Sequence, residues 1–149
     1  MIEYVAGFLF APDRTSVALV LKDHPAWQEG HLNGIGGKKE AGETWAEAMS
    51  REFEEEAGVR IHAEDWEHTV TLTSPNRWEL RFYRAFSDLV HTVKSMESET
   101  NVVVPVVRLG HLGYLHGKGT IPNLGWAIPM SLDDHLDFPV VLREKVAQG

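Results

Sequence analysis

Three glutamates, Glu52, Glu55 and Glu56, are spaced so that a helix would place them on one face. Like charges at these spacings repel each other and destabilise a helix. A divalent cation would offset the repulsion, because hard ions such as Mg²⁺ bind carboxylate oxygens and keep room for water and phosphate ligands. The alternative is an acidic face that is simply solvated. The spacing therefore points either to a metal site for phosphate chemistry or to a solvated helix surface.

The segment that carries these glutamates has the features of one helix with marked ends. Residues 44–57 are rich in Ala, Glu, Met and Arg, which favour helices. Thr44 and Glu47 fit a capping box, and Gly58 is a suitable C-terminal stop. The apolar stripe that is expected to face a core consists of Ala46, Met49, Phe53 and Ala57. The stretch before the helix is expected to be a loop, and its glycines are Gly34, Gly36, Gly37 and Gly42.

The stretch from Gly37 to Val59 resembles the signature of the Nudix hydrolases, the MutT-like pyrophosphohydrolases. Gly37 is followed after five residues by Glu43, and after seven more by the pair Arg51–Glu52. The remaining signature positions are Glu55, Glu56, Gly58 and Val59. Phe53 stands where the family usually has an aliphatic residue, and it also suits a buried position. The resemblance implies an α+β fold, an α/β/α sandwich with a mixed sheet on which the signature helix packs.

The resemblance also implies a cofactor, Mg²⁺ with Mn²⁺ as a substitute, and roles for single residues. Hydrolysis of a phosphoanhydride requires that phosphate charge is neutralised and that water is placed in line with the leaving oxygen. The expected metal ligands are the Gly36 carbonyl, Glu52, Glu55 and Glu56. Glu52 is expected to act either as a ligand or as the base that orients the water. The residues expected to support the loop and the helix are Gly37, Glu43, Arg51 and Gly58.

A further carboxylate often comes from a later loop in this family, as a base or as another metal ligand. Glu97 is the expected residue here and Glu99 is the alternative, because both precede a predicted strand. The other interpretation of both residues is a solvated loop.

Asn33 and Lys38 are the candidate substrate contacts. Residues 33–38 are similar to the corresponding stretch of Nudix enzymes that hydrolyse purine nucleoside triphosphates, including oxidised ones, in which the Asn reads the base edge. Lys38 would contact phosphate, or it is an ordinary surface lysine. The aromatic residues that would stack on a base, unless they belong to the core, are Trp27, Trp78, Tyr83 and Trp126.

Composition limits the class of protein and its partners. With 149 residues, 43% hydrophobic and 24% charged, the chain is expected to be a single domain over residues 1–149. A net charge of −8 argues against binding to a long nucleic-acid backbone. The absence of cysteine excludes disulfides and thiolate metal sites, and no apolar run approaches the length of about 18 residues that predicts a membrane span. We therefore expect no membrane partner and a cytoplasmic location, and a homodimer is left open.

The histidines do not predict a zinc site. The pairs His62 and His68, and His111 and His116, lack the compact ligand spacing that zinc sites use. We expect scattered surface histidines instead.

The rest of the chain predicts strands before and after the central helix. The expected strands are Ile2 to Phe10, Ser16 to Leu21, Trp66 to Thr73, Trp78 to Phe86, and Val102 to Leu109 with an interruption at Pro105. His31 to Ile35 is expected to be extended, and Leu124 to Leu132 to form a second helix. Gly110 to Asn123 is expected to be irregular, and Phe138 to Val146 fits either a strand or a helix. This order of elements is compatible with an α+β fold.

The leading functional hypothesis is a Mg²⁺-dependent enzyme that cleaves a nucleoside triphosphate, most simply a purine nucleotide that is normal or oxidised, to the monophosphate and pyrophosphate. A second hypothesis is a pyrophosphatase for ADP-ribose or another nucleoside diphosphate–sugar, because Pro75 lies sixteen residues beyond Val59, as in that subgroup. A turn at residues 74–76 explains the proline without any substrate. The third hypothesis, from a different class, is a non-catalytic module that senses nucleotides. It gives no reason for an intact set of repelling carboxylates.

Overall fold

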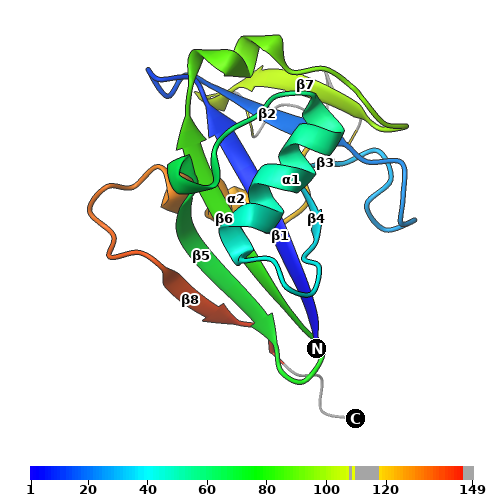
Figure 1. Ribbon diagram of the computed structural model, residues 1–149, viewed down its shortest axis with the longest axis vertical. Coiled ribbons are helices and arrows are strands. Elements are labelled where there is room, and N and C mark those ends of the chain that lie inside the picture. Colours follow the sequence, from blue (N-terminus) through cyan, green and yellow to red (C-terminus); the bar gives the residue numbers. More distant parts are fainter. Residues whose placement is uncertain (108, 110–117, 146–149) are drawn as a thin grey trace.

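The computed structural model describes residues 1–107, 109 and 118–145. Within these residues the chain forms an eight-stranded mixed sheet and two α-helices (Figure 1). The strands are β1 (Ile2–Phe10), β2 (Ser16–Leu21), β3 (Leu32–Asn33), β4 (Ile35–Lys38), β5 (Glu67–Ser74), β6 (Trp78–Phe86), β7 (Thr100–Pro105) and β8 (Val140–Arg143). The helices are α1 (Trp45–Ala57) and α2 (Leu124–Ser131), and short 3₁₀ turns span Ala63–Asp65 and Asp88–Thr92.

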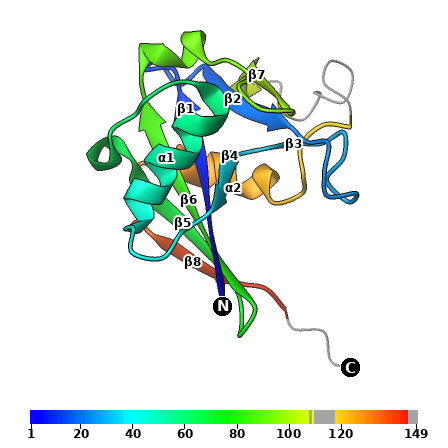
Figure 2. The ribbon, with the colours of Figure 1, turned by 45° about the vertical axis from the view of Figure 1, so that its right-hand side comes forward.

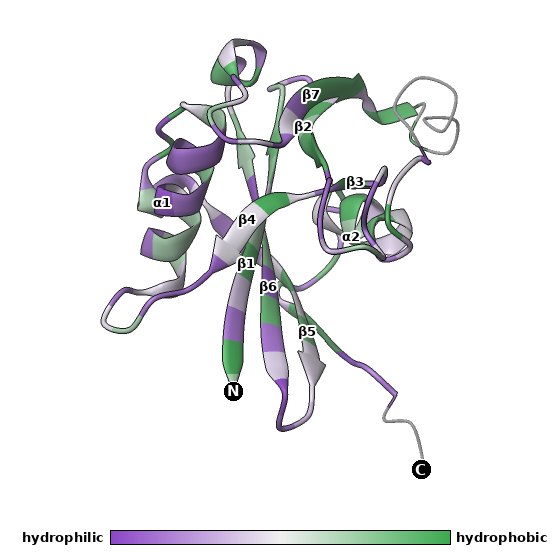
Figure 3. Cartoon of the chain, turned by 90° about the vertical axis from the view of Figure 1, so that its right-hand side faces the viewer, coloured by the Kyte–Doolittle hydropathy of each residue, from purple (hydrophilic) through white to green (hydrophobic). Residues whose placement is uncertain are grey.

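The two α-helices cover opposite faces of the sheet (Figure 2). Side chains alternate along β1, so Val5 and Leu9 enter the core under α1 while Phe8 and Phe10 enter the core on the α2 side. Figure 3 shows the same layers edge-on, with hydrophilic residues prominent along α1. A helix layer on each face of a mixed sheet confirms the expected α+β fold.

Strand β1 is an inner strand of the sheet and pairs with three other strands. It runs parallel to β6 from Ile2 to Phe10. On its other edge, Tyr4–Gly7 pairs with β4, whereas Leu9 and Phe10 pair with β2. Strand β2 pairs in turn with β7 along its whole length. Strands β4 and β2 therefore share one edge of β1 and separate from each other along it. The start of β7 lies beside the end of β2.

Helix α1 has the ends that its sequence predicts, and its buried face differs from the predicted one in that Ala48 is buried and Ala46 is not fully buried. Thr44 and Glu47 form the capping box, with N···O distances of 3.1 and 3.3 Å, and such a cap contributes about 1 kcal/mol. Gly58 ends the helix with a φ of 70°, a left-handed conformation that favours glycine. The buried residues of the helix are Ala48, Met49, Phe53 and Ala57, and Ala46 is only partly buried.

Two predicted segments are corrected by the structure. Ile35–Lys38 is strand β4 instead of a loop, because it pairs with β1, and a side chain at Gly36 would collide with the Val5 carbonyl. The strand predicted for Val102 to Leu109 begins earlier and ends at Pro105, whose ring removes a backbone donor.

The tail forms β8, which is parallel to β5, so the strand alternative holds for Val140–Arg143. The second predicted helix is confirmed as α2. Most of the irregular stretch from Gly110 to Asn123 lies outside the described residues. Among the helices of the described residues, none is both long and apolar enough to span a membrane.

Candidate active site

A cleft of about 320 Å³ lies beside the C-terminal half of α1, where β2, β4 and the segment before β7 meet. Gly36 of β4 contributes to its wall. The acidic residues that line it are Glu52, Glu56, Glu97 and Glu99. The lysines that line it are Lys22 and Lys38. Carboxylates from two distant segments of the chain therefore face one space.

Glu56 responds strongly to this environment. Burial raises the pKa of its carboxyl group from 4.5 to about 7, although the Lys22 ammonium lowers it. The other carboxylates that raise this pKa are Glu52, Glu99 and Glu97. A carboxyl group with a pKa of about 7 is partly protonated at neutral pH. The protein alone therefore does not fully stabilise a negative charge on Glu56.

Glu52 occupies a tight position between α1 and β4. Its side chain is only 14% exposed, and burial raises the pKa of the carboxyl group, even though the Arg51 guanidinium lowers it. A Cβ atom on Gly37 would lie 2.5 Å from Glu52 Oε2. Glycine at this position is what allows the carboxylate to lie against the strand.

Arg51 connects the loop before α1 to the acidic face of the helix. Its Nε and Nη2 donate to the carboxylate of Glu43 at 3.0 and 2.8 Å, and Nη2 also donates to the Lys38 carbonyl at 3.1 Å. Its Nη1 lies 2.9 Å from Glu52 Oε1. This two-pronged pairing with Glu43 fixes the guanidinium, and it holds the pKa of the Glu43 carboxyl group below its usual value. Arg51 can thereby hold Glu52 in one orientation.

Glu55 is placed differently from Glu52 and Glu56. Its side chain is 51% exposed and lies 3.3 Å from Arg51 Nη1. It lines a neighbouring shallow groove together with Arg60 rather than the cleft. Of the glutamates on this helix that were predicted as metal ligands, the structure brings Glu52 and Glu56 into the cleft and leaves Glu55 beside it.

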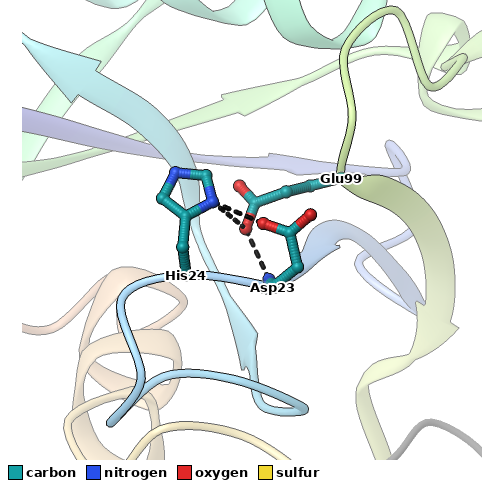
Figure 4. Close-up of side chains that lie close together, drawn as sticks. All are labelled: Asp23, His24 and Glu99. Atoms are coloured by element: carbon teal, nitrogen blue, oxygen red, sulfur yellow. Dashed lines mark hydrogen bonds and ion pairs between the residues drawn. The ribbon is translucent and has the colours of Figure 1, made fainter.

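The segment before β7 supplies Glu97 and Glu99, and their surroundings differ. Glu97 is exposed at the cleft wall. Glu99 accepts hydrogen bonds from Lys22 Nζ at 2.8 Å and from the Asp23 N–H at 2.6 Å, and its side chain is only 10% exposed. His24 also approaches Glu99, with Nδ1 at 3.5 Å (Figure 4). Both oxygens of Glu99 are therefore engaged by the end of β2.

The candidate substrate contacts divide between two places. Lys38 lines the cleft. The Asn33 side chain instead accepts a hydrogen bond from the Gly34 N–H at 2.7 Å and donates one to Gln28 at 2.9 Å. Asn33 is not among the residues of the cleft wall.

Most of the aromatic residues that could stack on a base are buried or partly buried within the fold. Tyr83 is buried and stacks on His68, and Trp126 packs edge-on against Phe82 in the α2 core. Trp78 is partly buried in β6. Trp27, in contrast, is 65% exposed in the loop after β2.

The structure describes the pair His62 and His68, and these two residues lie in different surroundings. His68 bonds Thr71, and His62 lines the shallow groove beside Glu55. His111 and His116 lie outside the described residues.

Lys22, His24 and Asn101 line the cleft but were not singled out from the sequence. Lys22 follows β2 immediately, and Asn101 lies at the start of β7 opposite Val20. No local pattern marks them, because only the pairing of β2 with β7 brings them beside the helix. The signal that could identify these three residues is therefore the pairing of β2 with β7.

The chemistry of the cleft fits a hard divalent cation. Its carboxylates outnumber its ammonium groups, and Gly36, whose carbonyl is the predicted backbone ligand, also lines it. Burial raises the pKa of Glu52 and of Glu56, so the charged form of each carboxyl group is disfavoured in the protein alone. A bound cation would stabilise that charged form. Asp23, His24 and Glu99 also offer ligand atoms within 4.8 Å of one another, but Glu99 is already paired with Lys22.

Comparison with known proteins gives a family match over most of the chain. Residues 3–115 match the model of the NUDIX domain. No curated protein shows significant similarity over its sequence.

Solved structures share the fold at low sequence identity. A structure from a study of MutT from Aliivibrio salmonicida and Vibrio cholerae is 24% identical, with a TM-score of 0.60, and the match covers 73% of this chain and 82% of that one. A MutT protein from Bacillus halodurans is 18% identical, with a TM-score of 0.71, and the match covers 96% and 90% of the two chains. A MutT/nudix family protein from Enterococcus faecalis is 20% identical, with a TM-score of 0.60, over 70% of this chain and 43% of that one. At these identities the likeness concerns the fold.

Proposed function

Because this chain belongs to the NUDIX domain family, we propose that it is a Mg²⁺-dependent hydrolase of a nucleoside diphosphate linked to another group. The favoured substrate is a purine nucleoside triphosphate, normal or oxidised, which is cleaved to the monophosphate and pyrophosphate. The observation that carries this proposal is the cleft, where Gly36, Glu52 and Glu56 meet Glu97.

The residues proposed to hold Mg²⁺, or Mn²⁺ in its place, are the Gly36 carbonyl, Glu52, Glu55 and Glu56. When bound, such an ion neutralises phosphate charge and lowers the pKa of a coordinated water. Glu55 is one helical turn from Glu52 and shares Arg51 with it, so its carboxylate is near the cleft without lining it.

The chain's own groups orient the water and the phosphates. We assign to Glu52 the role of a ligand or of the base that orients water, because Arg51 holds one of its oxygens and Gly37 leaves room for it. Lys38 places an ammonium group at the same cleft, where it would attract the polyphosphate, whereas the Lys22 ammonium is paired with Glu99. Gly37, Glu43, Arg51 and Gly58 are proposed to support this arrangement.

Glu97 rather than Glu99 is proposed as the further carboxylate. Glu99 has partners for both oxygens, whereas Glu97 is exposed at the cleft wall. A base or a ligand needs an accessible lone pair, which supports Glu97.

Three residues bear on the choice between a nucleoside triphosphate and ADP-ribose as the substrate. Pro75 lies in the turn between β5 and β6 and is absent from the cleft wall, so the turn accounts for it without an ADP-ribose substrate. Lys38 is proposed to contact phosphate, which both substrates offer, and Asn33 is kept as the proposed base contact although it lies outside the cleft wall. The proposal also includes a cytoplasmic location, and it is compatible with a homodimer.

A panel of nucleoside triphosphates, their oxidised forms and ADP-ribose, incubated with Mg²⁺, tests the proposal. Phosphorus NMR of the products should show a nucleoside monophosphate and pyrophosphate from a purine triphosphate. Release of AMP and ribose phosphate from ADP-ribose would favour the rival enzyme. Tight nucleotide binding without any product would favour the sensing module.

A further inference from the structure

The segment between the 3₁₀ turn Asp88–Thr92 and β7, residues 93–99, which we call the late loop, is fastened to the C-terminal end of α1. The Glu56 carbonyl accepts a hydrogen bond from the Met96 N–H at 3.0 Å. The Ala57 carbonyl accepts one from the Lys94 N–H at 2.8 Å. Carbonyls in the last turn of a helix have no partner within the helix and need one elsewhere. The late loop therefore satisfies the end of the helix that carries Glu56.

Asn101 strengthens this junction with its side chain. Its Nδ2 donates to the Glu56 carbonyl at 2.9 Å and to the Lys94 carbonyl at 2.8 Å. Its backbone N–H donates to Ser95 Oγ at 2.9 Å. Within β7, Asn101 is also paired in register with Val20 of β2. One residue thus connects the helix end, the late loop and the sheet.

The same junction determines how two carboxylates of the cleft face each other. Glu56 is bound through its carbonyl, and its side chain lines the cleft. Glu97 follows Met96, whose N–H binds that same carbonyl. Moving the late loop away from α1 would move Glu97 away from Glu56.

We infer that Asn101 is a positioning residue that holds Glu97 opposite Glu56, so that both carboxylates can serve one divalent cation. This inference rests on the proposed function. An amide suits the position because its NH₂ group has two donors, and the structure uses both on carbonyls. The other polar atom, Oδ1, is buried and has no hydrogen-bond partner within the described residues. The donors are therefore the part of this side chain that the junction uses.

Titration of the metal-free protein with Mn²⁺, followed by electron paramagnetic resonance, tests this role without relying on turnover. Asn101→Ala should weaken Mn²⁺ binding by about tenfold or more, the usual effect of removing a residue that orients ligands. Ser95→Ala is the matched control, because it removes a hydrogen bond from the same loop and leaves both bonds of Nδ2 in place. Its Mn²⁺ affinity should be unchanged. Thermal unfolding verifies that each variant is folded, and Asn101→Ser replaces Asn101→Ala if the latter does not fold.

A double-mutant cycle separates positioning from a general loss of structure. If Asn101 acts through Glu97, then Asn101→Ala should change the Mn²⁺ affinity far less in a Glu97→Gln background than in the native protein. Equal losses in both backgrounds would overturn the inference. Native Mn²⁺ affinity in Asn101→Ala would also overturn it and would leave the proposed function standing. A native protein that binds no Mn²⁺ would overturn both.

Discussion

Lys22 Nζ lies 2.8 Å from Glu99 Oε1, and the two side chains are only 18% and 10% exposed. This ion pair joins the end of β2 to the late loop within a cleft where negative charge prevails. It identifies Glu99 as a structural partner of Lys22 and leaves Glu97 as the accessible carboxylate.

Glu99→Gln should destabilise the protein by about 1.5–3 kcal/mol, because it removes the charged partner of a largely buried hydrogen bond from Lys22. Glu97→Gln is the control, and it should leave the free energy of unfolding unchanged, since Glu97 is exposed. Urea denaturation measures both. Equal effects of the two substitutions would contradict the division of roles between these residues.

Gly37→Ala should lower catalytic activity while leaving the protein folded. The added Cβ atom would come within 2.5 Å of Glu52 Oε2, so the carboxylate has to move away from its place against β4. The expected measurement is a lower kcat for pyrophosphate release, with a thermal midpoint close to that of the native protein.

Gly125→Ala in α2 is the matched control for this change. A Cβ atom there meets no other atom within 4 Å, and alanine favours a helix over glycine by about 0.5–1 kcal/mol. This variant should be slightly stabilised and fully active. Normal activity in Gly37→Ala would show that Glu52 does not need its observed position.

In the metal-free protein, Glu56 should contribute a loss of stability as the pH rises from about 4.5 to about 7. Burial raises the pKa of Glu56 from 4.5 to about 7 in the folded state, so folding favours the protonated carboxyl group. That contribution is fully present below the unfolded pKa and is lost as the pH passes through the folded value. The loss would be about 3 kcal/mol if Glu56 acted alone.

Denaturation with urea at several pH values, in the presence of EDTA, measures this dependence. Glu56→Gln cannot ionise at this position and should flatten the profile over the same range. Glu54→Gln is the control, because Glu54 is an exposed residue of the same helix outside the cleft, and it should keep the native profile. Identical profiles for the native protein and Glu56→Gln between pH 4.5 and 7 would contradict the raised pKa of Glu56.

The signature helix and most of the strands were predictable because they depend on local patterns. The capping box of Thr44 and the stop at Gly58 are written in neighbouring residues. The alternation along β6 and the β-branched residues of β2 likewise identify strands without knowledge of their partners.

The rest depends on contacts between distant segments. Strand β4 was missed because its glycines suggested a loop, whereas pairing with β1 makes an extended chain of small residues favourable. Lys22 and Asn101 enter the cleft only through the register of β2 and β7. The proposed preference for Glu97 over Glu99 likewise rests on the position of Lys22. These contacts belong to the tertiary structure, and no residue spacing within the sequence predicts them.

The dependence of pyrophosphate release on Mg²⁺ tests the central claim most directly. With a purine nucleoside triphosphate, the native protein and Glu54→Gln should release pyrophosphate in Mg²⁺ or Mn²⁺ and stop in EDTA. Glu56→Gln, alone or combined with Glu55→Gln, should be inactive in every condition while remaining folded by circular dichroism. Pyrophosphate release that continues in EDTA, or that survives in the doubly substituted protein, would contradict the claim that these carboxylates hold the catalytic ion.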